Sequence, residues 1–153
     1  MDIKFLKAAL KQAEKAKINN EVPIGAVVVK DNIIIGKGYN RREEKQLSFA
    51  HAEIYAIEKA CKKLKSWRLD DCEIYVTHEP CLMCYGAIIN ARIKNLYFGS
   101  YDDKREDRLS SILCLSTNNG LNHNLTAQGG ILEEDCKKLL KDFFNDKRAK
   151  KQQ

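Results

Sequence analysis

Two short motifs carry side chains that suit a transition metal. The first is H-x-E, with His51 and Glu53, and the second is P-C-x-x-C, with Cys81 and Cys84. One imidazole and two thiolates form the ligand set of a zinc site that keeps a fourth position for water, whereas a closed structural site needs a fourth protein ligand. No fourth ligand stands at motif spacing. The sequence therefore predicts a catalytic zinc site, in which Glu53 moves protons for the water.

The two cysteines are expected at the start of a helix, 81–91. They are three residues apart, so they share one helix face. Pro80 suits a helix start, because its missing N–H would have no intrahelical partner there. The positive end of the helix dipole lowers the pKa of thiols in a first turn and favours the thiolate that a metal needs. The spacing thus predicts both cysteines in the first turn of this helix.

His51 is expected to begin another helix, 51–64, and Glu53 must then reach around the helix tip to meet the metal. Residues 40–48 are polar and read as a loop that leads to His51. Apolar periodicity predicts the remaining elements, which are helices 2–18 and 132–148, strands 24–30, 33–39, 73–77 and 96–98, a short strand near 124–126 and a helical turn at 112–115.

The pattern of strand, helix and strand over 73–98 predicts a right-handed unit with two parallel strands. The metal motif follows the first of these strands directly. Open α/β sheets usually place their chemistry at the carboxyl ends of such strands. The topology therefore supports an active site, in addition to a metal site, at this end of the sheet.

Length and composition point to one globular domain, 1–153, with ordinary shares of hydrophobic (44%) and charged (31%) residues. The net charge of +6 is compatible with a polyanionic partner without establishing one. The amino-terminal stretch reads as an amphipathic helix rather than a secretory signal, and no apolar run is long enough to span a membrane. We therefore expect a cytoplasmic protein whose six cysteines are thiols and metal ligands, not disulfides.

Beyond the metal motifs, several stretches resemble one family over nearly the whole chain. The stretches are residues 21–27 (EVPIGAV), 39–41 (YNR), 50–54 (AHAEI), 75–77 (YVT), 79–81 (EPC), 122–123 (NH) and 139–144 (LLKDFF). The zinc motif alone is typical of the cytidine/deoxycytidylate deaminase superfamily. The EVPIGAV stretch and the DFF near the carboxyl end resemble the bacterial tRNA-specific adenosine deaminases within it.

This resemblance implies a three-layer α/β/α fold of the cytidine-deaminase type, with a central mixed sheet of about five strands. It implies one Zn²⁺ per subunit, held by His51, Cys81 and Cys84, with Glu53 as the general acid and base. Three further residues match positions that contact the extruded nucleotide, namely Val22, Asn40 and Phe144. The implied reaction is hydrolytic deamination of the wobble adenosine of a tRNA anticodon to inosine. The implied partners are an anticodon stem-loop, with an arginine tRNA expected, and a second copy of the chain in a homodimer.

The chain departs from the family pattern at two places. After Phe98-Gly99, residues 100–110 keep Asp102 and Lys104 but lack the glycines of the loop that approaches RNA in the family. His78 stands where the family usually has an apolar residue, and either a polar contact near the metal or simple packing would explain it. His123, in the Asn-His pair, fits a structural role and an RNA contact equally well.

Two other functions fit the same zinc motif. The chain could deaminate a free nucleobase or nucleoside, such as guanine, cytosine or cytidine, or it could bind RNA through a zinc module without catalysis. Salt-sensitive binding of tRNA separates the first alternative from the tRNA enzyme. Loss of activity in Glu53→Ala would exclude the second alternative, because a zinc module that only binds RNA does not need this carboxyl group. The other cysteines, Cys61, Cys72, Cys114 and Cys136, are expected to be core or surface residues rather than ligands.

Overall fold

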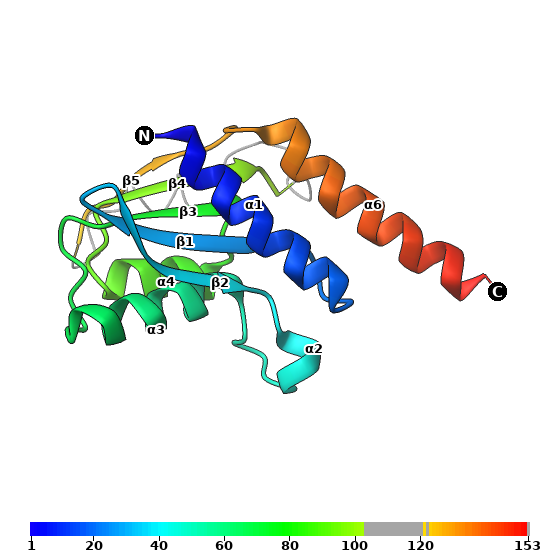
Figure 1. The fold of residues 1–153 in the computed structure, drawn as a ribbon, viewed down its shortest axis with the longest axis horizontal. Coiled ribbons are helices and arrows are strands. Elements are labelled where there is room, and N and C mark those ends of the chain that lie inside the picture. The colour runs from blue at the N-terminus through cyan, green and yellow to red at the C-terminus, as the bar shows by residue number, and fades with distance from the viewer. Residues whose placement is uncertain (103–120, 122, 153) are drawn as a thin grey trace.

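The computed structural model describes residues 1–102, 121 and 123–152, and it shows helices on both faces of a central sheet (Figure 1). The helical turn expected at 112–115 lies outside these residues. In chain order the elements are α1 (Ile3–Ile18), β1 (Gly25–Lys30), β2 (Ile33–Tyr39), α2 (Arg42–Lys45), α3 (Ala52–Leu64), β3 (Glu73–His78), α4 (Leu82–Asn90), β4 (Asn95–Ser100), β5 (Thr126–Gln128) and α6 (Glu133–Lys151).

The described strands form one mixed sheet of five, in the order β2-β1-β3-β4-β5. Strand β1 is antiparallel to β2 and β3, whereas β3, β4 and β5 are parallel. The expected parallel pair around α4 is therefore confirmed. The last strand was expected near 124–126 and instead covers Thr126–Gln128, because its pairing with β4 starts at Thr126. Within the described residues, no helix has the length and apolar character needed to cross a membrane.

Alternating residues of β1 face opposite layers of the molecule. Val27 and Val29 pack in one cluster with Phe5 and Leu6 of α1, and this cluster also includes Cys136 of α6. Val28 and Ala26 pack in the other cluster, whose helical members come from α3 and α4. The nearly continuous apolar run in this strand therefore reflects burial on both faces. This arrangement confirms the predicted α/β/α layers (Figure 1).

The helix starts differ in detail from the expectations. Asp2 caps α1 by accepting a hydrogen bond from the backbone N–H of Lys4 at 3.0 Å. Helix α4 begins at Leu82 with Cys81 as its N-cap, so the prediction that Cys81 lies in the first turn is wrong by one position, and Pro80 precedes the cap. The loop predicted at 40–48 contains the short helix α2, which lacks an apolar face that a sequence pattern could reveal.

Helix α3 lies very close to β2 because the contact is made by the smallest residues. A methyl group at Gly38 would overlap the carbonyl oxygen of Ala52 and come within 2.7 Å of the Ala56 nitrogen. Gly36, two residues earlier on the same strand face, meets Ala56 in the same way. On the helix side, Ala52, Ala56 and Ala60 are fully buried. The first turn of α3 is therefore placed by backbone contact with β2.

We predict that Gly38→Ala lowers the melting temperature, because overpacking a tight contact costs about 1–3 kcal/mol. The atoms of α3 that the new methyl group would meet are backbone atoms and a Cβ, which cannot move aside as the end of a flexible side chain could. For a chain of this length, the expected drop is roughly 2–10 °C in thermal unfolding followed by circular dichroism. Gly86→Ala is the matched control: it adds a methyl group on α4 that meets no other described part of the chain within 4 Å, so its stability should equal or exceed that of the wild type. A Gly38→Ala protein as stable as the wild type would contradict the proposed backbone contact.

Candidate active site

Three side chains from the starts of α3 and α4 converge on one point. His51 is the N-cap of α3, Cys81 is the N-cap of α4, and Cys84 follows in the first turn. The Nδ1 atom of His51 lies 3.7 Å from the Cys81 sulfur and 3.4 Å from the Cys84 sulfur. All three ligand atoms lie within 4.8 Å of one another. Around a tetrahedral zinc ion, imidazole nitrogen and thiolate sulfur atoms are separated by roughly 3.5 Å, so the spacing fits this metal.

The electrostatics of the three residues favour the deprotonated sulfur that a metal requires. Hydrogen bonds from the Cys84 thiol and then from His51 lower the pKa of Cys81 to about 3. The contact with Cys81 in turn raises the pKa of His51. The neighbouring Cys81 sulfur raises the pKa of Cys84. The cluster therefore favours loss of a proton from one thiol, and metal binding would release the proton of the other.

Glu53 lies beside the cluster as a deeply buried carboxyl group, with 3% of its surface exposed. Burial raises its pKa, although the nearby His51 acts in the opposite direction. Its Oε1 atom is fully buried and has no hydrogen-bond partner among the described residues. An unpartnered buried carboxyl oxygen is costly and marks a functional position. It fits a group that exchanges protons with a water molecule at the metal.

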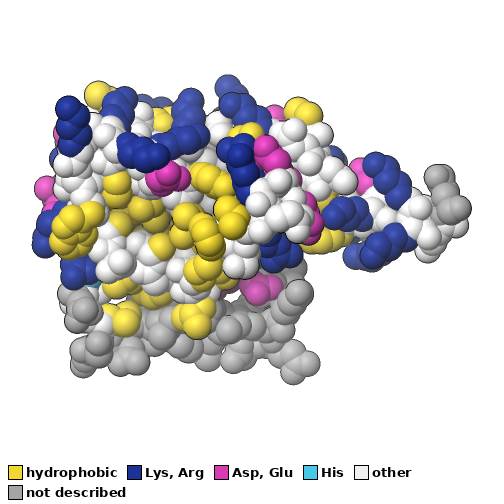
Figure 2. All heavy atoms as spheres, turned by 90° about the horizontal axis from the view of Figure 1, so that it is seen from below, with side chains coloured by type: hydrophobic (Ala, Val, Ile, Leu, Met, Phe, Trp, Pro, Cys, Tyr) yellow, Lys and Arg dark blue, Asp and Glu magenta, His cyan; other side chains and the backbone are white. Residues whose placement is uncertain are grey.

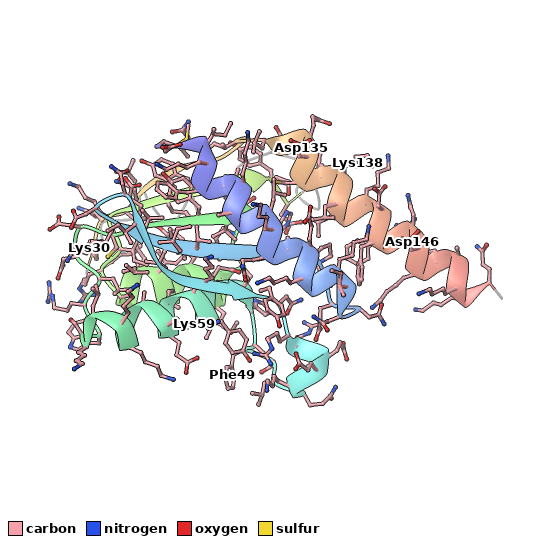
Figure 3. The ribbon with its side chains drawn as sticks, viewed as in Figure 1. Lys30, Phe49, Lys59, Asp135, Lys138 and Asp146 are labelled. Atoms are coloured by element: carbon pink, nitrogen blue, oxygen red, sulfur yellow. The ribbon has the colours of Figure 1, made fainter. Side chains whose placement is uncertain are left out.

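The cluster opens into a cavity of about 1210 Å³. The cavity is lined by Val22, Ile24, Asn40, His51, Ala52, Glu53, His78, Glu79, Pro80, Cys81, Leu82, Ser100, Tyr101, Asp102, Glu134, Asp135, Lys137, Lys138, Leu140, Lys141 and Phe144. It lies where β3 ends, as the parallel topology predicts. Asp135 and Lys138 mark the part of α6 that forms one wall (Figure 3). This volume is more than one nucleobase needs.

The three residues that sequence resemblance assigned to the nucleotide all line this cavity. Val22 precedes β1, and Asn40 follows β2, where its side-chain amide lies 3.4 Å from the Val22 carbonyl oxygen. On α6, Phe143 is buried and Phe144 is 42% exposed, with the two rings edge to face at 5.4 Å. Phe143 therefore packs against the rest of the molecule, while Phe144 faces the cavity.

Several lining residues were not assigned from the sequence. His78 and Ser100 are opposite each other on β3 and β4, and the His78 Nδ1 atom lies 2.7 Å from the Ser100 hydroxyl oxygen. Glu79 accepts a hydrogen bond from the backbone N–H of Asp102 at 3.0 Å. Glu79 belongs to the Glu-Pro-Cys motif, which could have pointed to it. The His78 contact depends on strand register, which the sequence pattern did not specify.

His123 and the other described cysteines lie outside the cluster. His123 donates from Nε2 to the carbonyl oxygen of Ile93 at 2.7 Å and does not line the cavity, so its described contact is structural. Cys72 and Cys136 are buried, and Cys61 is half-buried. None of these three belongs to the metal cluster found among the described residues, and Cys114 lies outside them.

Known proteins resemble this chain over nearly its full length. A family model described as MafB19-like deaminase matches residues 2–148. The tRNA-specific adenosine deaminase of Bacillus subtilis (strain 168) is 42% identical over 147 residues, which are 96% of this chain and 91% of that protein. These matches extend far beyond the zinc motifs and include both walls of the cavity.

Solved structures agree with the sequence relatives. A structure from a study of A-to-I editing by tRNA:A34 deaminases at the wobble position has a TM-score of 0.83 and 38% identity, and it covers 91% of this chain and 100% of that chain. A guanine deaminase from Bacillus subtilis is 43% identical, with a TM-score of 0.62 and 66% of each chain covered. The resemblance found in the sequence is thus confirmed, and the chain belongs to the deaminase family and, within it, to the tRNA-specific adenosine deaminases.

Proposed function

We propose that this chain converts the wobble adenosine of a tRNA anticodon to inosine by hydrolysis. The observation that carries this proposal is the buried Glu53 carboxyl group beside His51, Cys81 and Cys84, at one end of a cavity with room for a nucleotide. Water supplies the oxygen at C6 of the base, and the amino group leaves as ammonia. The close similarity to tRNA-specific adenosine deaminases over 96% of the chain selects RNA as the substrate.

In this reaction His51, Cys81 and Cys84 would hold zinc, and Glu53 would transfer the protons. When bound, zinc supplies a Lewis acid that makes a water molecule nucleophilic near neutral pH. Glu53 would take a proton from water and pass it to the adenine ring. It would then move the proton of the added hydroxyl group to the amino group, which leaves as ammonia. Burial raises the pKa of Glu53, which suits a carboxyl group that must both accept and donate a proton.

Three side chains hold the extruded nucleotide in this proposal. Asn40 is 8% exposed and offers an amide that can hydrogen-bond a base edge or a sugar. Val22 supplies an apolar contact on the same side of the cavity. Phe144, whose ring is exposed, can stack on a base from the opposite wall, as aromatic side chains do with unstacked RNA bases. Because loop bases are already splayed, extrusion of the target from an anticodon costs little.

The anticodon stem-loop of an arginine tRNA is the proposed substrate, and the cytoplasm is the proposed compartment because tRNA is modified there. Lys137, Lys138 and Lys141 of α6 line the cavity and can meet phosphates that flank the target. The Lys138 ammonium group donates a hydrogen bond to the Asp142 carboxylate at 2.9 Å, and the Lys138 side chain is 76% exposed. The RNA body would then run along α6, whose projecting end carries many cationic side chains (Figure 2).

A homodimer is proposed on the evidence of an apolar surface. Hydrophobic side chains gather on the face that carries α3 and α4 (Figure 2). Leu82 is 68% exposed and Met83 40% exposed at the start of α4, and Phe49, before α3, is 51% exposed (Figure 3). Large exposed apolar patches mark interaction surfaces. Because Leu82 also lines the cavity, a second copy bound here would lie close to the RNA.

Free guanine is the alternative substrate, because a guanine deaminase is 43% identical to the chain over the shared region. That match covers 66% of the chain, whereas the structure from the tRNA:A34 deaminase study covers 91% with a higher TM-score. The cavity, which continues from the metal cluster to α6, also favours an RNA loop over a single base. The first assay should nevertheless include guanine.

We predict that the purified chain binds about one zinc ion and that Cys84→Ala removes it, because two remaining ligands cannot hold a stable site. Zinc content by mass spectrometry of the desalted protein provides the measurement. Cys72→Ala is the matched control, since Cys72 is also a buried thiol but lies outside the cluster. Equal zinc content in the Cys84→Ala and wild-type proteins would contradict the ligand assignment.

We predict that Glu53→Gln retains zinc but lowers kcat by about 10²–10⁴, the usual contribution of a general acid and base. The amide keeps the size of the carboxyl group and cannot take the proton. Single-turnover formation of inosine, with zinc content measured in parallel, tests this prediction. Glu58→Gln, which changes an exposed glutamate of the same helix, should behave as the wild type. Undiminished turnover in Glu53→Gln would remove Glu53 from the mechanism.

For the substrate, we expect inosine from an arginine-tRNA anticodon stem-loop with a wobble adenosine and no ammonia from free adenosine, guanine or cytosine. Inosine is detected because reverse transcription copies it as guanosine. Raising the salt from 50 to 200 mM should weaken RNA binding by about tenfold or more, because phosphate contacts release counterions. Release of ammonia from guanine with the RNA left intact would instead support the free-base alternative.

A further inference from the structure

Glu21 is a buried carboxylate that binds backbone rather than solvent. It lies three residues after the end of α1 and is only 1% exposed. Its two oxygens accept hydrogen bonds from consecutive backbone N–H groups, that of Glu43 at 3.0 Å and that of Glu44 at 2.8 Å. Both donors belong to α2, a helix of four residues whose own first-turn N–H groups have no intrahelical partner. The proposed reaction gives Glu21 no part.

The two bonds join separate stretches of chain that each supply a cavity wall. Val22 is the next residue after Glu21, and Asn40 lies two residues before α2. Asn40 is also linked to this region directly, because its backbone N–H donates to the Ile24 carbonyl oxygen at 3.1 Å. Its side-chain oxygen accepts from the N–H of Arg42 at 3.3 Å. The side-chain amide of Asn40 is therefore held from two sides. It contacts Val22, which follows Glu21, and Arg42, the first residue of α2.

The stretch from Asn40 to His51 projects away from the sheet, with α2 at its far end (Figure 1). Its base is closed by the Arg41 N–H, which donates to the Ala50 carbonyl oxygen at 2.9 Å. The exposed residues of α2 bury no apolar surface, and the structure describes none of its residues as buried. The stretch therefore lacks a hydrophobic anchor at α2, where the carboxylate of Glu21 supplies two charge-assisted hydrogen bonds instead.

We infer that Glu21 is a positioning residue that fixes Val22 and Asn40 for the extruded nucleotide by fastening α2 to the end of α1. This inference rests on the proposed function for its readout on RNA. The chemistry of zinc and Glu53 does not depend on it. Both cysteines and Glu53 are held by other elements, and His51 is held as the N-cap of α3 by the contact of that helix with β2. When the fastening is lost, only a fraction of molecules has the binding wall in place, and the apparent affinity falls by that fraction.

Glu21→Gln in the zinc-loaded chain tests the role. The amide keeps the size of the side chain, but its NH₂ group faces a donor and cannot accept, so one of the two bonds is lost. We expect KM for the anticodon stem-loop to rise by about tenfold, the loss of one hydrogen bond to a charged group, with kcat within about twofold and zinc content unchanged. Simple electrostatics predicts the opposite sign, because removal of a negative charge should tighten binding to RNA.

Glu14→Gln is the matched control, since Glu14 is an exposed glutamate of α1 and its loss changes the net charge equally. It should leave KM unchanged or lower it slightly. An unchanged or lower KM in Glu21→Gln would overturn the positioning role. Parallel losses of kcat, zinc and thermal stability would also overturn it, because they would indicate a general effect on folding.

Amide hydrogen exchange of the wild-type protein provides a test that needs neither a variant nor RNA. The N–H groups of Glu43 and Glu44 should be protected, although they lie in the first turn of an exposed helix, because Glu21 binds them. Exchange at the rate of unprotected amides would overturn the inference. If the wild type shows no activity on the stem-loop while these amides are protected, the proposed function has failed and the fastening by Glu21 stands.

Discussion

The active site depends on the meeting of two helix starts. His51 and Cys81 are N-caps, so their positions are set by where α3 and α4 begin rather than by their own side-chain packing. The start of α4 is fixed by the end of β3, and the start of α3 by its contact with β2. Because β1 lies between these strands, the sheet order determines the distance between imidazole and thiols. A shift of either helix start would therefore change the distances between the ligands.

Much of this arrangement could be predicted from the sequence, because its signals are local. Two ligand motifs predicted the metal cluster, and the strand-helix-strand pattern predicted the parallel pair β3 and β4. The nearly continuous apolar run of β1 agrees with its burial on both faces. The parts that were missed lack such a signal. Helix α2 has no apolar face, and β5 is a three-residue strand without buried residues, so pairing with β4 alone decides where it begins.

The residues proposed to contact the nucleotide could be predicted less well from the sequence. Val22, Asn40 and Phe144 were proposed as nucleotide contacts through family resemblance alone, since neither their types nor their spacing predicts a base contact. Periodicity could not decide which of Phe143 and Phe144 is buried, because adjacent residues of a helix point in different directions and the apolar stripe is wide. The two bonds of Glu21 join residues 22 and 23 positions apart, and no motif connects them.

The contact between α3 and β2 has a consequence for the precision of the metal site. Glycine and alanine have no rotatable side-chain torsions, so the interface of Gly36 and Gly38 with Ala52 and Ala56 has no alternative rotamers to populate. An interface of leucines or methionines can change its side-chain rotamers by thermal motion, whereas this interface has no rotamers to exchange. The imidazole of His51 is thus carried by a junction with almost no internal configurational freedom, and the ligand geometry requires little ordering when the metal binds.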